Sequence, residues 1–152
     1  REKLEDAGRL TPVVEKTLLM YRQAVQGQWA FERSLDEEIP NIRCIAIEPF
    51  SVRSLSGGDI SGNHKIEGIG AGFVPSICRL DLADEIMAVR DEDAYETARK
   101  LARVEGIFGG TTSGANVWAA IQRARIIGAG KRIVTVIVDS GLKYLNGDLY
   151  KS

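Results

Sequence analysis

The chain has 152 residues, of which 44% are hydrophobic and 27% are charged, and its formal net charge is −1. This length and composition are those of one globular domain with a core of its own. The balanced charge gives no electrostatic reason to expect a nucleic acid or an anionic membrane as a partner. The two cysteines are too few for the disulfide framework of a small secreted domain.

Several features favour a cytoplasmic protein. Cys44 lies in a strand-like run, so we expect a buried thiol in a reducing compartment. No apolar run reaches about 18 residues, the length that a membrane-spanning helix needs. The first residues are charged and helix-like, so we expect no signal peptide. No His/Cys cluster has the spacing of a metal site, so no metal is expected.

The first part of the chain differs in pattern from the rest. Residues 1–38 follow helical spacing with breaks, and we expect a helical N-terminal segment of unclear origin there. Residues 39–152 form the second expected domain. It opens with an almost continuously apolar run from Arg43 to Pro49, which predicts a strand covered on both faces. A Ser- and Gly-rich loop over 51–63 follows.

Two amphipathic patterns predict helices further along the chain. The first covers 93–104, with Asp91 as its N-cap and Gly106 as its end. The second covers 115–127 and ends at Gly128. The residues of the second helix that we expect to face inward are Val117, Ala120, Ile121 and Ala124.

Strand patterns lie before, between and after these helices. They are expected at 86–89, 107–108 and 133–138, and the last is the clearest strand pattern in the chain. Strands that alternate with helices predict an α/β fold, with a mainly parallel sheet flanked by helices. Functional loops of such a fold lie at the carboxyl ends of its strands, here after Phe108 and Val138.

The most informative stretch runs from Gly106 to Asn116. Glycines and three hydroxyl residues stand between a short apolar run and a helical pattern. Such a loop leads into a helix N-terminus, where backbone N–H groups and the helix dipole point at a bound group. Glycine lets that group approach the backbone closely. The stretch therefore predicts a small-molecule site without naming the molecule.

Five blocks of residues match a known enzyme family in order and approximate spacing. They are Ile45–Pro49, His64–Pro75, Ala98–Ala102 with Glu105-Gly106, Thr112–Ala115, and Asp139–Gly141 with Tyr144-Leu145. Through them the chain, from about Ile42 onward, resembles the O-acetylserine sulfhydrylase (cysteine synthase) branch of the fold-type II pyridoxal-phosphate enzymes. Cystathionine β-synthase is a close relative of this branch. The resemblance implies most of the large domain of such an enzyme, and pyridoxal phosphate as cofactor.

The resemblance also implies an activity and a set of site residues. Family members convert O-acetylserine and sulfide to L-cysteine, so the implied partner is a small amino-acid substrate. By resemblance, Ser113 bonds the pyridine nitrogen of the cofactor. The full cofactor-side set is Gly110, Thr112, Ser113, Asp139 and Ser140. The substrate-side loop is Gly68, Ile69, Gly70, Ala71 and Gly72.

Three family motifs are missing from the chain. They are the P-S-x-S-x-K-x-R motif with the Schiff-base lysine, the S-G-N-T-G substrate loop and the G-T-G-G-T phosphate loop. Without that lysine no catalytic residue is assigned, and we expect the chain to be inactive alone. It would then act as a homodimer or associate with a missing N-terminal half. The alternatives are a non-catalytic binding or interaction module that kept the fold and, less well supported, a nucleotide-binding domain.

Other candidate groups are expected to have ordinary structural roles. His64 is the one histidine, and we expect a loop residue because it lacks the partners of a general base. Lys65 and Lys143 are expected at the surface, where a lysine stays protonated and forms no Schiff base readily. Cys44 and Cys78 have no local group that would activate a thiolate.

Overall fold

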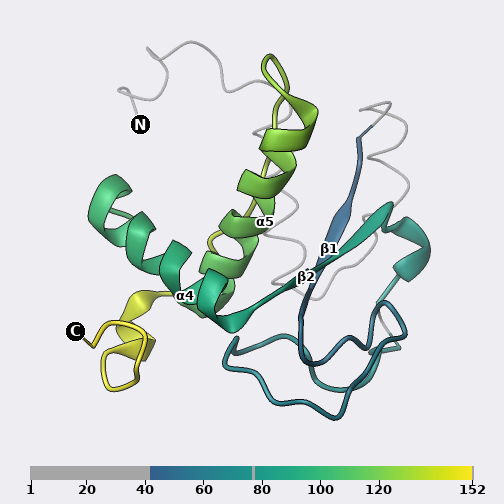
Figure 1. Ribbon diagram of the computed structural model, residues 1–152, viewed down its shortest axis with the longest axis horizontal. Helices are drawn as coiled ribbons and strands as arrows, with labels where there is room; N and C mark the ends of the chain where they lie inside the picture. The colour runs from purple at the N-terminus through teal and green to yellow at the C-terminus, as the bar shows by residue number, and fades with distance from the viewer. Residues whose placement is uncertain (1–41, 77, 152) are drawn as a thin grey trace. The chain divides into compact units, whose positions relative to one another are not determined.

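The computed structural model describes residues 42–76 and 78–151 (Figure 1). All the described helices and strands belong to the second of two compact units, Cys44–Ser152. The predicted helical segment over 1–38 lies outside the described residues. The domain boundary at residue 38 therefore stays a prediction.

Two parallel strands form the described sheet. β1 spans Ile45–Pro49 and β2 spans Glu85–Val89, with Ile47 opposite Met87. Both strands occur where the apolar runs predict them. Parallel pairing confirms the expected α/β class, because two parallel strands need a long connection between them.

The start of β1 differs from expectation at Cys44. This residue is exposed, so the prediction of a buried thiol is wrong. The strand begins one residue later, and the Cys44 N–H donates to the Asp84 carboxylate at 2.7 Å. Cys44 therefore lies at the rim of the sheet rather than inside it.

Helix α4 spans Asp91–Lys100 and continues as a π-helical segment, Leu101–Glu105. It ends as predicted at Gly106, whose φ of 69° lies in the left-handed region that favours glycine. Asp91 is not the N-cap. That position is held by Arg90, while the Asp91 carboxylate accepts the N–H of Lys65 at 2.7 Å. Asp91 thus ties the helix to the preceding loop instead of capping its own first turn.

Helix α5 spans Thr111–Ile127, so it begins four residues before the predicted start. The hydroxyl residues of the predicted loop are therefore its first turn. Close packing against α4 requires a glycine there, because a Cβ on Gly114 would lie 2.1 Å from the Ala94 carbonyl oxygen. α5 contacts both α4 and the β1–β2 pair (Figure 1).

The core lies between the two strands and the two helices. Its buried members are Ile66, Val89, Ala94, Ala115 and Ala119, with Ile47, Ile69, Met87 and Trp118 packed against them. Small residues where α4 and α5 meet let the two helices approach closely. The core therefore holds the first half of α5 firmly, which is the half that carries the predicted site.

The second half of α5 and the run after it depart from the prediction. Of the residues expected to face inward, Ile121 is 42% exposed, and Ala124 is exposed as well. The runs 107–108 and 133–138 form no strand, and the one antiparallel bridge near them joins Gly109 to Ser140, just beyond their ends. A strand needs a hydrogen-bonding neighbour. Among the described residues, no segment supplies that neighbour to 133–138.

Candidate functional site

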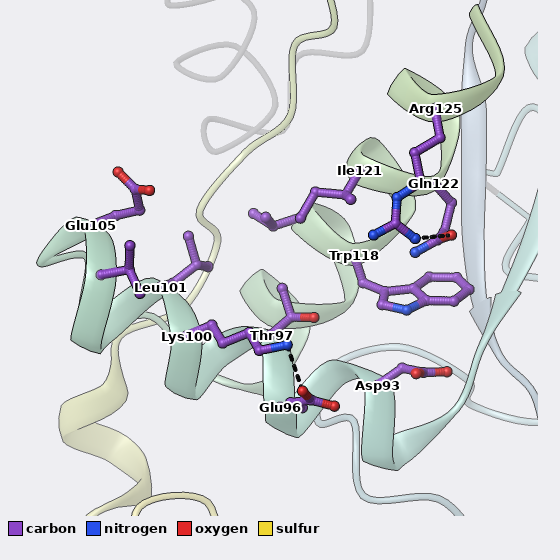
Figure 2. A pocket seen from close by; sticks show the side chains of 12 residues that line it. Asp93, Glu96, Thr97, Lys100, Leu101, Glu105, Trp118, Ile121, Gln122 and Arg125 are labelled. Atoms are coloured by element: carbon purple, nitrogen blue, oxygen red, sulfur yellow. Dashed lines mark hydrogen bonds and ion pairs between the residues drawn. The ribbon is translucent and has the colours of Figure 1, made fainter. Parts of the chain in front are cut away.

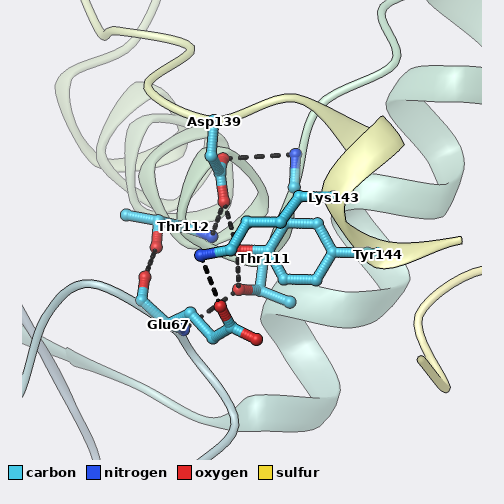
Figure 3. A network of polar contacts seen from close by, with 7 residues as sticks. Glu67, Thr111, Thr112, Asp139, Lys143 and Tyr144 are labelled. Atoms are coloured by element: carbon cyan, nitrogen blue, oxygen red, sulfur yellow. Dashed lines mark hydrogen bonds and ion pairs between the residues drawn. The ribbon is translucent and has the colours of Figure 1, made fainter. Parts of the chain in front are cut away.

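Three segments far apart in sequence meet at the N-terminus of α5 (Figure 3). They are the glycine loop, which we define as Glu67 to Gly72 and which contributes Glu67, the first turn of α5 from Thr111, and the loop from Asp139 to Tyr144. This is the end of the fold at which the sequence predicts a small-molecule site. The structure brings four predicted cofactor-side residues into one polar network with Glu67, which precedes the predicted substrate-side loop; the four are Gly110, Thr112, Ser113 and Asp139.

The carboxylate of Asp139 lies at the centre of this network. It accepts the backbone N–H groups of Gly110 at 3.2 Å, Thr112 at 3.2 Å and Ser113 at 2.9 Å. It also accepts the Tyr144 hydroxyl at 2.8 Å and the Ser113 hydroxyl. The orphan N–H groups of the α5 N-terminus therefore bind an anion that belongs to the chain itself.

These hydrogen bonds set the charge of Asp139. Burial alone would raise the pKa of its carboxyl group. The hydrogen bonds from Ser113, Tyr144 and Thr112 outweigh burial and hold the pKa below its ordinary value. Asp139 is thus an anion at neutral pH. In the neighbouring Tyr144, burial raises the pKa of the phenol, which stays protonated and donates.

Glu67 joins the glycine loop to this helix terminus. Its N–H donates to Thr111 Oγ1 at 3.1 Å, and its carbonyl oxygen accepts the Thr112 hydroxyl. Its carboxylate pairs with Lys143 Nζ at 2.6 Å. The Glu67 partner raises the pKa of Lys143, whose side chain is 64% exposed. Lys143 is therefore a protonated surface cation at neutral pH and a poor nucleophile, in agreement with the sequence.

The substrate-side loop takes a backbone path that glycine permits. Gly68, Gly70 and Gly72 have φ values of 91°, 68° and 79°. At Gly70 a Cβ would also lie 2.5 Å from Pro49 and 2.6 Å from His64. His64 Nε2 lies 3.1 Å from the Gly70 carbonyl oxygen, so this histidine is a loop residue as expected. Within the loop, Ile69 packs on the core and Ala71 is exposed.

Gly110 and Ser140 have structural roles in the site. Gly110 is buried, and a Cβ there would lie 2.2 Å from both Asp139 Oδ2 and the Tyr144 ring. The close packing of the network therefore depends on this glycine. Ser140 caps a short 3₁₀ turn, Gly141–Tyr144, by accepting the Leu142 N–H. Its role in cofactor binding stays a prediction.

Sequence reasoning assigned no site role to three members of the network, Glu67, Thr111 and Tyr144, although all three lie in stretches that it noted. All three stand next to predicted residues. Glu67 precedes the first glycine of the substrate-side loop, Thr111 begins the hydroxyl run and Tyr144 follows the Asp139 loop. The signal available in the sequence was a carboxyl or hydroxyl group, able to form hydrogen bonds, next to a predicted site residue. Only the folded arrangement shows that they bond one another.

The network fits pyridoxal phosphate in part. Ser113 offers a hydroxyl on the first turn of a helix, a suitable donor for a ring nitrogen, although the residue is fully buried and its hydroxyl bonds Asp139. The N–H groups that could hold a phosphate are already bonded to Asp139. Every lysine of the described residues is exposed. The described residues therefore suit the ring-nitrogen edge of the cofactor and suit neither its phosphate nor its aldehyde.

A groove between α4 and α5 lies apart from this network (Figure 2). Thr97, Leu101, Trp118 and Ile121 line it, with charged side chains such as Glu96, Lys100 and Arg125 around them. Lys100 Nζ pairs with Glu96 at 2.5 Å. No residue of the predicted site lines the groove. The predicted small-molecule site and this groove are therefore different places.

Within the described part of the chain, no three His, Cys, Asp or Glu residues gather into a group that could hold a metal ion. No described helix combines the length and the apolar character that crossing a bilayer requires.

Comparison with known proteins places the fold and the network in context. The family model described as "Pyridoxal-phosphate dependent enzyme" matches residues 27–139. A curated relative, the cysteine synthase of Staphylococcus aureus (strain Mu50), is 45% identical over 116 residues, which are 76% of this chain and 37% of the relative. The chain thus spans little more than a third of the curated relative it matches.

Solved structures agree with the sequence relatives. Cysteine synthase from Entamoeba histolytica matches with a TM-score of 0.75 and 37% identity, over 79% of this chain and 36% of that one. The O-acetylserine dependent cystathionine β-synthase from Helicobacter pylori matches with a TM-score of 0.73 and 36% identity, over 82% of this chain and 40% of that one. These matches confirm the fold predicted from the sequence.

Proposed function

The chain belongs to the pyridoxal-phosphate-dependent enzyme family, and from this premise we propose that it forms part of a cysteine synthase that makes L-cysteine from O-acetylserine and sulfide. The observation that carries the proposal is the attachment of the glycine loop to the α5 N-terminus through Glu67, Thr111 and Thr112. This attachment supports the proposal because Glu67 directly precedes the predicted substrate-side loop, and Thr112 is one of the predicted cofactor-side residues. The alternative, a non-catalytic interaction module, is not favoured, because the relatives are named as enzymes.

When bound, pyridoxal phosphate supplies the electron sink for chemistry at the α- and β-carbons of an amino acid. In our proposal the Ser113 hydroxyl turns from the Asp139 carboxylate to the ring nitrogen of this cofactor, while the Asp139 N–H still donates to Ser113 Oγ. The same side of the cofactor is lined by Gly110, Thr112 and Ser140. Gly68 and Gly72, where an added Cβ would meet nothing within 4 Å, leave room above them for a substrate.

The proposal assigns the remaining chemistry to residues beyond those described. The described lysines are exposed, and the described N–H groups at α5 are bonded to Asp139. An enzyme built with this segment needs a lysine and a phosphate loop from another part of the family fold. We extend the proposal to a cytoplasmic homodimer, or to association with an N-terminal half that carries those groups.

A chimera tests the proposal directly. The matched region of the Staphylococcus aureus cysteine synthase is replaced by the corresponding residues of this chain, and L-cysteine formation from O-acetylserine and sulfide is measured. We expect activity together with the absorbance of bound cofactor. Ser113→Ala in the chimera should alter the cofactor spectrum and lower activity, whereas Ser61→Ala, at an exposed serine, should change neither.

Two results would count against the proposed function. A folded chimera that binds the cofactor but makes no L-cysteine would show that this segment does not support the reaction. An unchanged cofactor spectrum in the Ser113→Ala chimera would show that Ser113 does not contact the cofactor.

A further inference from the structure

The last described residues pass beside α4 and reach the turn before α5 (Figure 1). There the Tyr150 hydroxyl donates to the Gly109 carbonyl oxygen at 2.6 Å and lies 3.4 Å from the Ala98 carbonyl oxygen of α4. A phenol has one hydrogen to donate, and the shorter contact takes it. Burial raises the pKa of Tyr150, so the phenol stays protonated at neutral pH. Tyr150 is therefore a neutral donor to Gly109.

The bond from Tyr150 holds one side of a peptide group whose other side belongs to the Asp139 network. The Gly109 carbonyl and the Gly110 N–H are the two polar ends of one planar peptide group. The Gly110 N–H donates to the Asp139 carbonyl oxygen at 3.1 Å and to the Asp139 carboxylate at 3.2 Å. The peptide group is thus held at its oxygen by Tyr150 and at its nitrogen by Asp139.

This peptide group needs both bonds because a glycine stands on each side of it. Glycine allows backbone rotations that other residues resist. Gly109 is buried, and among the described residues Tyr150 is the one donor that bonds its carbonyl oxygen. Loss of that donor leaves a buried acceptor unpaired. A rotation that gives the oxygen another partner turns the Gly110 N–H away from Asp139.

Gly109 also lies directly against Ser113. A Cβ on Gly109 would lie 2.9 Å from Ser113 Cβ and 3.3 Å from Ser113 Oγ. The N–H groups of Ser113 and Gly110 both donate to the same carboxylate oxygen, Asp139 Oδ1. A rotation at Gly109 therefore disturbs both the serine and the carboxylate that bonds it.

Arg99 of α4 holds the segment that carries Tyr150. Its Nε donates to the Leu149 carbonyl oxygen at 2.6 Å, and its Nη2 donates to the Asp148 carbonyl oxygen at 3.0 Å. The Leu149 side chain is fully buried. The ring centroids of Tyr150 and Phe108 lie 4.6 Å apart. Backbone bonds, burial and ring packing together give the Tyr150 hydroxyl a defined place.

We propose that Tyr150 is a positioning residue for the cofactor side of the site, because its hydroxyl fixes the Gly109–Gly110 peptide group and thereby the place of Ser113. The inference rests on the proposed function for the identity of the ligand. Tyr150 acts only through the peptide group, so it is not a catalytic residue. A phenylalanine would keep the ring contact with Phe108 and lose the bond, so the hydroxyl carries the role.

Hydrogen exchange on the full chain tests the proposal without cofactor or activity. In Tyr150→Phe we expect about tenfold faster exchange of the amides that donate to Asp139, which are those of Gly110, Thr112 and Ser113. The amide of Ala119, in the middle of α5, should keep its rate, because the packing of the ring is unchanged. Faster exchange confined to the start of α5 distinguishes positioning from a general loss of stability.

Tyr95→Phe is the matched control. Tyr95 is a half-buried tyrosine that packs on the same cluster as Tyr150. Among the described residues, the Tyr95 hydroxyl has no hydrogen-bond partner. Removing this hydroxyl should leave the exchange of all these amides unchanged.

The chimera described above, extended to include residues through Tyr150, carries the test to the cofactor. There Tyr150→Phe should alter the spectrum of the bound cofactor in the same direction as Ser113→Ala, and by less, since the serine itself remains. Tyr95→Phe should leave the spectrum unchanged.

Three results would overturn the proposal. One is unchanged exchange at the start of α5 in Tyr150→Phe. Another is a rise of equal size throughout α5, which would make the hydroxyl a contributor to overall stability alone. The third is a chimera whose cofactor spectrum responds to Ser113→Ala and does not respond to Tyr150→Phe. Faster local exchange, with a chimera that makes no L-cysteine, would support the positioning role while the proposed function fails.

Discussion

Asp139, the centre of the network, and the run 133–138 adjoin each other in the sequence, but their hydrogen bonding differs. Asp139 directly follows Val138, yet its carboxylate accepts hydrogen bonds from α5 and from Tyr144. The run before it forms no ladder with any described segment. Side-chain and helix-terminal bonds can be completed within one small unit. An inner strand can be completed only by adjacent strands.

The largest effect is expected where the network depends on helix packing. In Gly114→Ala, the new Cβ would lie 2.1 Å from the Ala94 carbonyl oxygen, so α4 and α5 must separate. We expect a loss of about 3 kcal/mol in the free energy of unfolding. Urea unfolding followed by helical circular dichroism measures it.

Gly147→Ala is the control for this substitution. Its Cβ would meet only the Tyr144 carbonyl oxygen, at an ordinary 3.6 Å. Equal stability of the two variants would show that the two helices can move apart at little cost.

Asp139→Asn tests the centre of the network. The amide keeps the shape of the side chain but places an NH₂ group against N–H donors. Because Asp139 is only partly buried, solvent screening limits the expected loss to about 2 kcal/mol. Asp148→Asn, at a side chain that is 73% exposed, is the matched control in the same urea experiment. A loss no greater than that of the control would contradict the central role of Asp139.

Lowering the pH should reduce the contribution of the Asp139 carboxylate to the free energy of unfolding. Its folded-state pKa is lowered, so its contribution is fully present above the unfolded-state pKa of about 3.9. That contribution is lost as the pH falls through the lower folded-state value. We expect the stability difference between the parent and Asp139→Asn to shrink below about pH 4. A difference that stays constant down to pH 2.5 would mean that Asp139 does not titrate in this way.

Tyr144→Phe removes one donor and leaves the rest of the network. The lost hydroxyl donates to Asp139 Oδ2 at 2.8 Å and lies 3.3 Å from the Thr111 hydroxyl. We expect a loss of about 1 kcal/mol, smaller than for Asp139→Asn, because the carboxylate keeps its other donors. Thermal unfolding compares the variant with Leu142→Ala, at a leucine that is 68% exposed. A larger stability loss in Tyr144→Phe than in Asp139→Asn would show that Tyr144, rather than Asp139, is the centre of the network.

The smallest effect is expected in the run itself. Val134 is 55% exposed, so Val134→Ser should change the stability of the isolated chain by no more than about 0.5 kcal/mol. The same urea unfolding experiment measures it. A loss comparable to that of Asp139→Asn would show that the run is already packed in the isolated chain. The contrast between the two regions would then disappear.

Part of the fold could be read from local pattern. The strand runs at β1 and β2, the helical face of α4 and the glycine at its end all lie where periodicity predicts them. The start of α5 could not be read this way, since Thr111 and Thr112 have the composition of a loop. They are helical because Asp139, far along the chain, accepts the N–H groups of Gly110, Thr112 and Ser113 at the start of the helix.

The sequence by itself determined the family, the α/β class and the segments that hold the candidate site. Those features depend on residue types at fixed spacing, which the chain carries whether or not it is folded. Only the tertiary structure showed that Asp139 occupies the α5 N-terminus, that Glu67 attaches the glycine loop to it and that 133–138 forms no ladder with another described segment. Those facts depend on contacts between distant residues, and a strand pattern cannot reveal whether its neighbours are present.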